Sequence, residues 1–277
     1  MHRLFVLALL GSSAFGLHTA QAADYIEIPP PPVYVEEKPD YSGWYIRGDV
    51  GYLFESKTDL HYRMFFDHDE HDSRYHFDDV RHQSGFTAGG GVGYRVASHF
   101  RTDVTADYYR FDTKGESRCP RVPFRESFAG GYGGGDACTI NDRSDADVWT
   151  VMANAYVDLP YFGMVTPYFG AGIGAAHVSY GELHNVITNK YTGQVIVDDV
   201  HQGESSWRFA SSLSAGASID ITKNLALDAG YRYTRVFSGD AFGFDTEDTA
   251  LGATGVQSED NGFNIHALRA GLRYSFF

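Results

Sequence analysis

The last ten residues of the chain, from Leu268 to Phe277, alternate between apolar and polar side chains. Successive side chains of a β-strand point to opposite faces, so this alternation predicts one apolar face and one polar face. The apolar face comprises Leu268, Ala270, Leu272, Tyr274 and Phe276, and the polar face carries Arg269, Arg273 and Ser275. A strand divided in this way suits the wall of a membrane-spanning barrel, with lipid outside and a polar interior.

Period-two alternation recurs in eight segments, and their spacing is informative. The gaps after the second, fourth and sixth segments are short, whereas the other four run to about two or three dozen residues. Short periplasmic turns that alternate with long extracellular loops are typical of outer-membrane barrels. We therefore predict an all-β fold, an eight-stranded antiparallel up-and-down transmembrane β-barrel with long extracellular loops. The predicted strands are Gly43–Phe54, Gly85–Arg95, Phe100–Phe111, Asp147–Asp158, Thr166–Val178, Trp207–Asp220, Leu225–Val236 and Phe263–Phe276.

Away from the strand ends, one face of every predicted strand is free of charge. A bilayer favours such a face because Arg or Lys at its midplane costs about 2–4 kcal/mol. An eight-stranded barrel is only wide enough inside for its own side chains, so we expect the charges of the opposite face to pair in a buried network. A narrow ion path is the alternative. The charged face carries Arg47, Asp49, Arg95, Arg101, Asp103, Asp107, Asp158, Arg208, Asp228, Arg232, Arg269 and Arg273.

Aromatic residues mark the ends of the predicted strands. Trp44, Trp149 and Trp207 all lie at segment ends. Such positions favour two aromatic girdles at the membrane–water boundaries, where amphipathic rings are stable.

The N-terminal region indicates export. Residues 1–22 combine a basic start, an apolar stretch and an Ala20-Gln21-Ala22 cleavage pattern, which is typical of a signal peptide. Residues 23–42 form a Pro-rich, acidic segment that we expect to be a periplasmic leader. The barrel is predicted over 43–277, in the cell outer membrane. The formal net charge of −14 argues against nucleic acid as a partner, since phosphates require a basic surface.

Two cysteines, Cys119 and Cys138, flank one Gly-rich stretch between predicted strands. An exported chain meets an oxidising compartment, so we expect them to form a disulfide. Free or metal-bound thiols are the alternative.

The first long connection is rich in histidine and carboxylate. Imidazole and carboxylate groups can bind a transition metal, and histidine clusters can bind haem. The spacing selects no ligand set, and an acidic, solvated loop is the competing interpretation. The candidate metal ligands are His61, His68, His71, His76 and His82.

Three stretches give the chain a resemblance to a known family: Ser42 to Tyr52, Pro167 to Gly174, and Leu268 to Phe276. They resemble the small opacity-protein-like outer-membrane β-barrels of Gram-negative bacteria, including alphaproteobacterial surface antigens. The terminal aromatic of this chain differs in one respect, because Phe276 and not Phe277 is in phase with the apolar face. The resemblance implies roles in envelope stability, adhesion and, in some relatives, haem binding. It also implies contact with outer-membrane lipids, lipopolysaccharide and the barrel-assembly machinery.

The sequence shows no Gly-x-Ser-x-Gly elbow, and no Ser or Asp can be paired with a His as a catalytic unit. We therefore expect a non-enzymatic outer-membrane barrel with structural, envelope-integrity and surface-exposed roles. A surface-binding protein, either an adhesin with a host or cell-surface ligand or a protein that captures metal or haem, is the alternative. A small channel is a further one.

Overall fold

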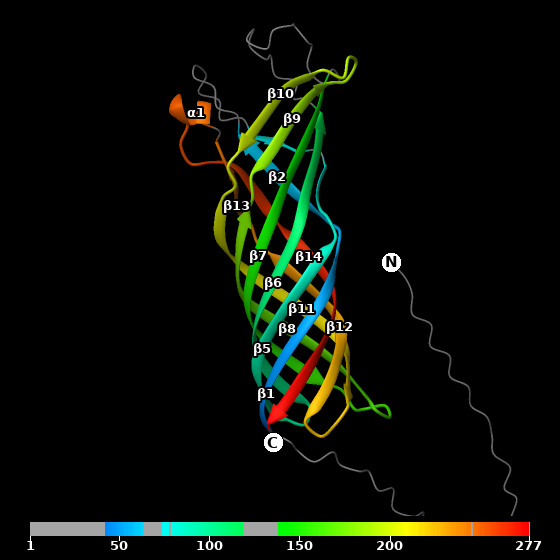
Figure 1. The fold of residues 1–277 in the computed structure, drawn as a ribbon. Coiled ribbons are helices and arrows are strands. Elements are labelled where there is room, and N and C mark those ends of the chain that lie inside the picture. The colour runs from blue at the N-terminus through cyan, green and yellow to red at the C-terminus, as the bar shows by residue number, and fades with distance from the viewer. Residues whose placement is uncertain (1–41, 64–73, 78, 119–137, 245, 277) are drawn as a thin grey trace, which may run out of the picture. The chain divides into compact units, whose positions relative to one another are not determined.

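The computed structural model describes residues 42–63, 74–77, 79–118, 138–244 and 246–276. Eight strands pair antiparallel with their neighbours, and the last of them, β14, pairs with β1 and closes the ring (Figure 1). The predicted eight-stranded antiparallel barrel is thus confirmed. The ring consists of β1 (Gly43–Phe54), β5 (Gly85–Ala97), β6 (Phe100–Arg118), β7 (Cys138–Asp158), β8 (Val165–Tyr180), β11 (Ser205–Asp220), β12 (Leu225–Val236) and β14 (Val256–Phe276).

The connections predicted as long loops contain a large amount of β structure. Six further strands are present: β2 (Ser56–Arg63), β3 (Arg74–His76), β4 (Asp79–His82), β9 (Leu183–Asn189), β10 (Val195–His201) and β13 (Gly239–Gly243), together with the short helix α1 (Thr246–Ala250). Four of them, β2, β4, β9 and β13, pair with extensions of β6, β7 and β14. The other two pair within the connections, β3 with β2 and β10 with β9. We call these six strands, together with residues 110–118, 138–147 and 256–264, the collar. Figure 1 shows β9 and β10 at the end of the barrel opposite to the C-terminus.

The outward face of β7 shows where the bilayer ends. Trp149, Val151 and Val157 are about half exposed and face outward together with two alanines. Towards the collar, the same face continues with Asp147, Asp145, Arg143 and Asn141, all polar. The apolar outward face therefore ends at Trp149, as expected for a wall that passes from lipid into water.

Aromatic contacts mark both edges of this apolar band, as predicted. At the edge nearest the C-terminus, Trp44 and Tyr94 contact each other edge to face, with ring centroids 5.3 Å apart. At the collar edge, Trp149 contacts Tyr108 at 4.9 Å. Trp207 contacts His177 there, also at 4.9 Å. We call the collar-edge residues the outer girdle. Within the described part of the chain, no helix is long and apolar enough to cross a membrane.

The interior changes character along the barrel axis. Between the girdles it is filled mainly by charged and polar side chains, whereas the collar encloses an apolar core. Phe242 on β13 is 1% exposed and contacts Tyr180, with ring centroids 5.1 Å apart. His82 lies between Phe111 and Phe263, at 4.4 and 4.8 Å. The collar core therefore lies directly above the charged lumen.

The filled lumen, the collar and the family of the chain

The periplasmic half of the lumen is built from arginine–aspartate pairs. Arg101 Nε lies 3.0 Å from Asp158 Oδ1, and Arg273 Nε lies 3.0 Å from Asp228 Oδ2. Arg95 adds a longer contact to Asp158, at 3.5 Å. The alternation of side chains along each strand points these arginines into the barrel. Each aspartate neutralises the arginines beside it, as a low-dielectric interior requires.

A second layer of pairs lies closer to the collar. Asp107 accepts from Arg232 at 2.8 Å and also from Arg269. Arg269 contacts Asp49 as well. The side chains of all four residues are at most 7% exposed. Such a network stabilises the fold only while every charge keeps its partner, because an uncompensated buried charge costs several kcal/mol.

The two layers are joined by polar side chains. Asn154 donates to Asp103 at 2.8 Å, and Arg47 lies 3.3 Å from the same carboxylate. The hydroxyl of Tyr156 accepts from Arg47 and from Arg232, both at 3.1 Å. The expected buried network is confirmed.

Glycines on β8 make room for this network. A Cβ atom at Gly172 would collide with the side-chain oxygen of Asn154, and one at Gly170 would collide with the ring of Tyr156. Side chains from the neighbouring strand β7 therefore fill the space above the backbone of β8. The lumen is packed with its own side chains across the membrane.

Sequence reasoning missed the partner of Arg208. This guanidinium donates to Asp260, to which the hydroxyl of Tyr180 also donates at 3.0 Å. Counted back from Phe276 with period two, Asp260 should face outward. Gly262 has a φ of +82° and the pairing register shifts beside it, so the face changes and Asp260 points inward. Gly262 interrupts a strand of alternating side chains, and this glycine was the signal in the sequence that could have indicated the change of face.

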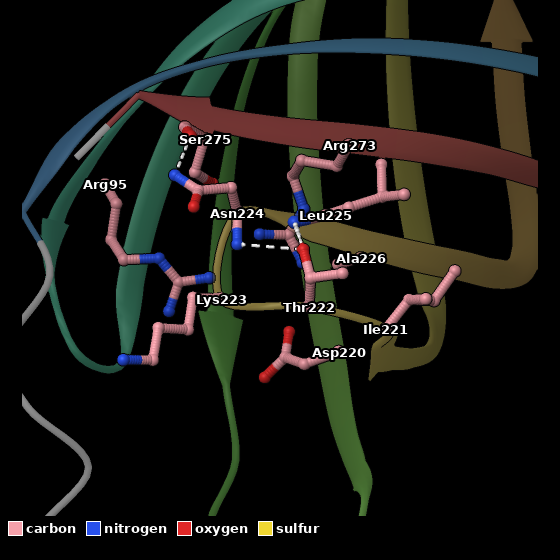
Figure 2. Close-up of a pocket in the computed structure, with 10 residues that line it drawn as sticks. All are labelled: Arg95, Asp220, Ile221, Thr222, Lys223, Asn224, Leu225, Ala226, Arg273 and Ser275. Atoms are coloured by element: carbon pink, nitrogen blue, oxygen red, sulfur yellow. Dashed lines mark hydrogen bonds between the residues drawn. The ribbon is translucent and has the colours of Figure 1, made fainter.

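The periplasmic mouth holds a cavity of about 340 Å³ beneath the β11–β12 turn (Figure 2). The turn is fastened to β14, because Asn224 Nδ2 donates to the carbonyl oxygen of Ser275 at 2.8 Å. Figure 2 shows Arg95 and Lys223 at the left of the view, with Asp220 to the right of Lys223. Arg273 lines the inner wall and is bound to Asp228. The mouth thus ends on the periplasmic layer of ion pairs.

The structure brings two of the five candidate histidines together. His61 and His76 are register partners on β2 and β3, with ring centroids 4.0 Å apart. His82 pairs instead with Ser56, five positions along β2 and therefore roughly 17 Å from His61. His68 and His71 lie outside the described residues. Within the described ranges no three His, Cys, Asp or Glu side chains converge on a common point, and the metal site stays a prediction.

The surroundings of His82 are those of a core residue and not those of a metal ligand. Burial lowers its pKa to about 3, and the positive charge of Arg208 acts in the same direction. Its Nδ1 lies 2.9 Å from the hydroxyl of Thr113. The imidazole is therefore a neutral member of the collar core.

Asp142 on β7 is a second unusual group of the collar. Its carboxylate is buried and accepts from Asn185 Nδ2 at 2.7 Å, while Oδ2 has no hydrogen-bond partner within the described ranges. Burial raises its pKa to about 7, against the lowering effect of that hydrogen bond.

Cys138 is the first residue of β7 and is not a free thiol. Its predicted partner, Cys119, lies outside the described residues, so the pairing stays a prediction. The predicted signal peptide of residues 1–22 also lies outside them, as does the predicted leader except for its last residue, Ser42.

Comparisons with known proteins agree with this architecture. A family model described as "Outer membrane protein beta-barrel domain" matches residues 7–276. A Brucella suis protein described as uncharacterized is 44% identical over 269 residues, which cover 93% of each chain. A Rickettsia bellii protein described as a presumed adhesin is 26% identical over 231 residues, 83% of this chain and 87% of the other. The crystal structure of Neisserial surface protein A covers 86% of this chain and 100% of its own, with 19% identity and a TM-score of 0.42.

The family match extends over nearly all of the sequence, including every strand of the closed ring. The chain belongs to the outer membrane protein β-barrel domain family, and the protein resides in the outer membrane.

Proposed function

We propose that this protein is a non-enzymatic outer-membrane barrel that supports the integrity of the envelope and carries an ordered surface-exposed collar. The observation that carries the proposal is the filled lumen. Asp107, Asp158 and Asp228 are each bound by arginine, so the buried carboxylates serve packing and neutrality. A barrel of this kind anchors the protein in the membrane, and the collar makes the contacts with the exterior.

A second candidate function is surface binding, and the β9–β10 hairpin favours it. Val195, Ile196 and Val200 on β10 are between 36% and 53% exposed, an unusual degree for β-branched residues of a soluble region. The Rickettsia bellii relative described as a presumed adhesin supports this candidate. Capture of metal or haem is another form of surface binding, and the contact between His61 and His76 supports it.

The hairpin can be removed without opening the barrel. Tyr180 N donates to Glu204 O at 3.0 Å, so the ends of β8 and β11 already lie side by side. Deleting residues 183–201 would leave Gly181, Glu182, Gln202 and Gly203 as a short turn between them.

Cells that lack the protein, cells with the full chain and cells with the deletion variant should be compared for dye uptake and for attachment to host cells. We expect the strain without the protein to take up more dye, and both forms of the protein to restore the barrier. Unchanged dye uptake in the strain without the protein would contradict the structural function. Attachment with the full chain that is lost both in the strain without the protein and with the deletion variant would support the binding function.

A further inference from the structure

Basic side chains form a cross-strand row on the outer surface of the collar. The register pairs Lys57 with Arg81, Arg81 with Lys114, Lys114 with Arg143, and Arg143 with His184. All five residues are exposed, and the row crosses β2, β4, β6, β7 and β9. Like charges directly opposite each other in a sheet are destabilising. Such a row therefore needs anions beside it.

The protein supplies those anions for one half of the row. Arg81 lies 2.6 Å from Asp79 and 2.9 Å from Glu55. Lys57 lies 3.4 Å from Asp79. Asp79 lies two residues from Arg81 on β4 and diagonally opposite Lys57, and Glu55 immediately precedes β2, diagonally opposite Arg81.

The other half lacks such partners. No ion pair joins Lys114 or Arg143 to any acidic group of the described segments. Two carboxylates lie diagonally opposite Lys114 by register, and both are bound by other residues: Asp145 by Arg110 at 3.2 Å and Asp79 by Arg81 at 2.6 Å. Lys114 and Arg143 thus face each other across β6 and β7 with their charges open to an external anion.

A hollow of about 490 Å³ lies at these residues. Lys114, Arg143 and His184 line it together with the carboxylates of Asp112, Glu182 and Asp145, the last of which is bound by Arg110. Nitrogen donors suit a phosphate group, whereas carboxylates accept hydrogen bonds from hydroxyl groups. A bare phosphate would use only half of this lining. A phosphorylated sugar would use all of it.

The height of the hollow above the bilayer indicates where that sugar comes from. Lys114 is six residues beyond Tyr108 of the outer girdle, and Arg143 is six residues from Trp149. Six residues span roughly 20 Å along a strand, and roughly 15 Å along the membrane normal at the usual tilt. The sugars of outer-leaflet glycolipid lie at that level, beyond the headgroup boundary.

We propose that Lys114, Arg143 and His184 bind the phosphate-bearing sugars of outer-leaflet lipopolysaccharide. This inference rests on the proposed structural function and gives it a partner, since a barrel that binds its surrounding glycolipid ties the envelope together. It adds a specific site to the general contact with outer-membrane lipid.

The test uses two double variants of the full-length barrel refolded in phospholipid vesicles. Lys114→Gln with Arg143→Gln removes the open half of the row. Lys57→Gln with Arg81→Gln removes the same formal charge from the half that has acidic partners. Heat-modifiable migration and thermal unfolding verify that both variants fold. Binding of phosphorylated lipopolysaccharide, of the same lipopolysaccharide after enzymatic dephosphorylation, and of inorganic phosphate is then measured.

We expect the first variant to bind phosphorylated lipopolysaccharide about tenfold more weakly, since two charge-assisted contacts are lost, and the charge-matched control to bind within about twofold of wild type. The difference should vanish with dephosphorylated lipopolysaccharide. Equal weakening in both variants, or a difference that survives dephosphorylation, would overturn the site. Inorganic phosphate binding as tightly as lipopolysaccharide would overturn the assignment to glycolipid. None of these results bears on dye uptake, which tests the proposed function separately.

Discussion

Asp107 concentrates the energetics of the lumen in one residue. It accepts from Arg232 and Arg269, which stand 125 and 162 positions away in the sequence. A buried charge pair of this kind adds little net stability, but removal of one partner leaves an uncompensated charge and costs about 3–5 kcal/mol. The lumen therefore tolerates few single substitutions.

Asp142 gives the collar a pH dependence that can be measured. Its folded-state pKa of about 7 lies above the ordinary value of 3.8, so the folded protein retains the proton more strongly than the unfolded chain. Stability is then fully present below about pH 4 and is lost as the pH rises through 7. Asp142→Asn should remove this loss and stabilise the collar by roughly 2–4 kcal/mol at pH 8, with little effect at pH 4.

Hydrogen exchange of β7 and β9 at the two pH values would measure the effect, with the exposed Asp112→Asn as control. A pH-independent difference between wild type and the Asp142→Asn variant would show that the carboxyl is not buried in its protonated form.

Gly262 tests the change of face on β14. Alanine there should destabilise the collar by roughly 1–3 kcal/mol, because a positive φ strains any side chain and its Cβ would collide with the carbonyl oxygen of Val236. Gly193 has a comparable φ of +72°, but nothing lies within 4 Å of an added Cβ. Gly193→Ala is therefore the matched control.

Thermal unfolding of the two variants should show a larger decrease for Gly262→Ala. Equal decreases would mean that backbone strain alone matters at both glycines.

Among the secondary-structure elements, β7 shows both what the sequence predicts and where prediction stops. Within the part predicted from Asp147 to Asp158, the outward face is free of charge from Trp149 to Val157, and that is how it was found. From Asp147 back to Cys138 the strand continues, but its outward face is charged and its inward face carries the apolar residues Ile140 and Ala146. Beyond the girdle the outward face meets water and can carry charge, so a search for charge-free outward faces ends there.

The sequence also could not predict which partner each inward-facing charge would contact. Period two predicts correctly that Arg47 and Arg232 face the lumen, because side-chain direction is a local property. Which carboxylate each arginine meets depends on the stagger between strands far apart in the sequence. The same holds for the row at Lys114 and Arg143, which only the register reveals.

The two parts of β7 should differ in how strongly a substitution by arginine destabilises them. Ala153 faces outward midway between the girdles, so Ala153→Arg should destabilise the barrel by about 2–4 kcal/mol. Asn141 faces outward in the collar, where Asn141→Arg should have little effect because the side chain meets water. Denaturant unfolding in vesicles would compare them. A similar response at both positions would contradict the boundary at Trp149.

For the whole molecule, the barrel inverts its pattern at the outer girdle. Within the bilayer it is apolar outside and polar inside, and in the collar it is polar outside and apolar inside. The surroundings of each part explain its pattern. Apolar surface faces lipid in the membrane-spanning part and is withdrawn from water in the collar. Ion pairs fill the lower interior, and an apolar core closes the upper one.

Conductance across planar bilayers tests this central claim most directly. The refolded wild-type barrel should produce no reproducible stepwise current, because arginine–aspartate pairs and the collar core fill the interior. A porin in the same bilayer would serve as the positive control. Reproducible current steps for the wild type, altered in size by Asp107→Asn, would show that ions pass through the lumen and would contradict the account.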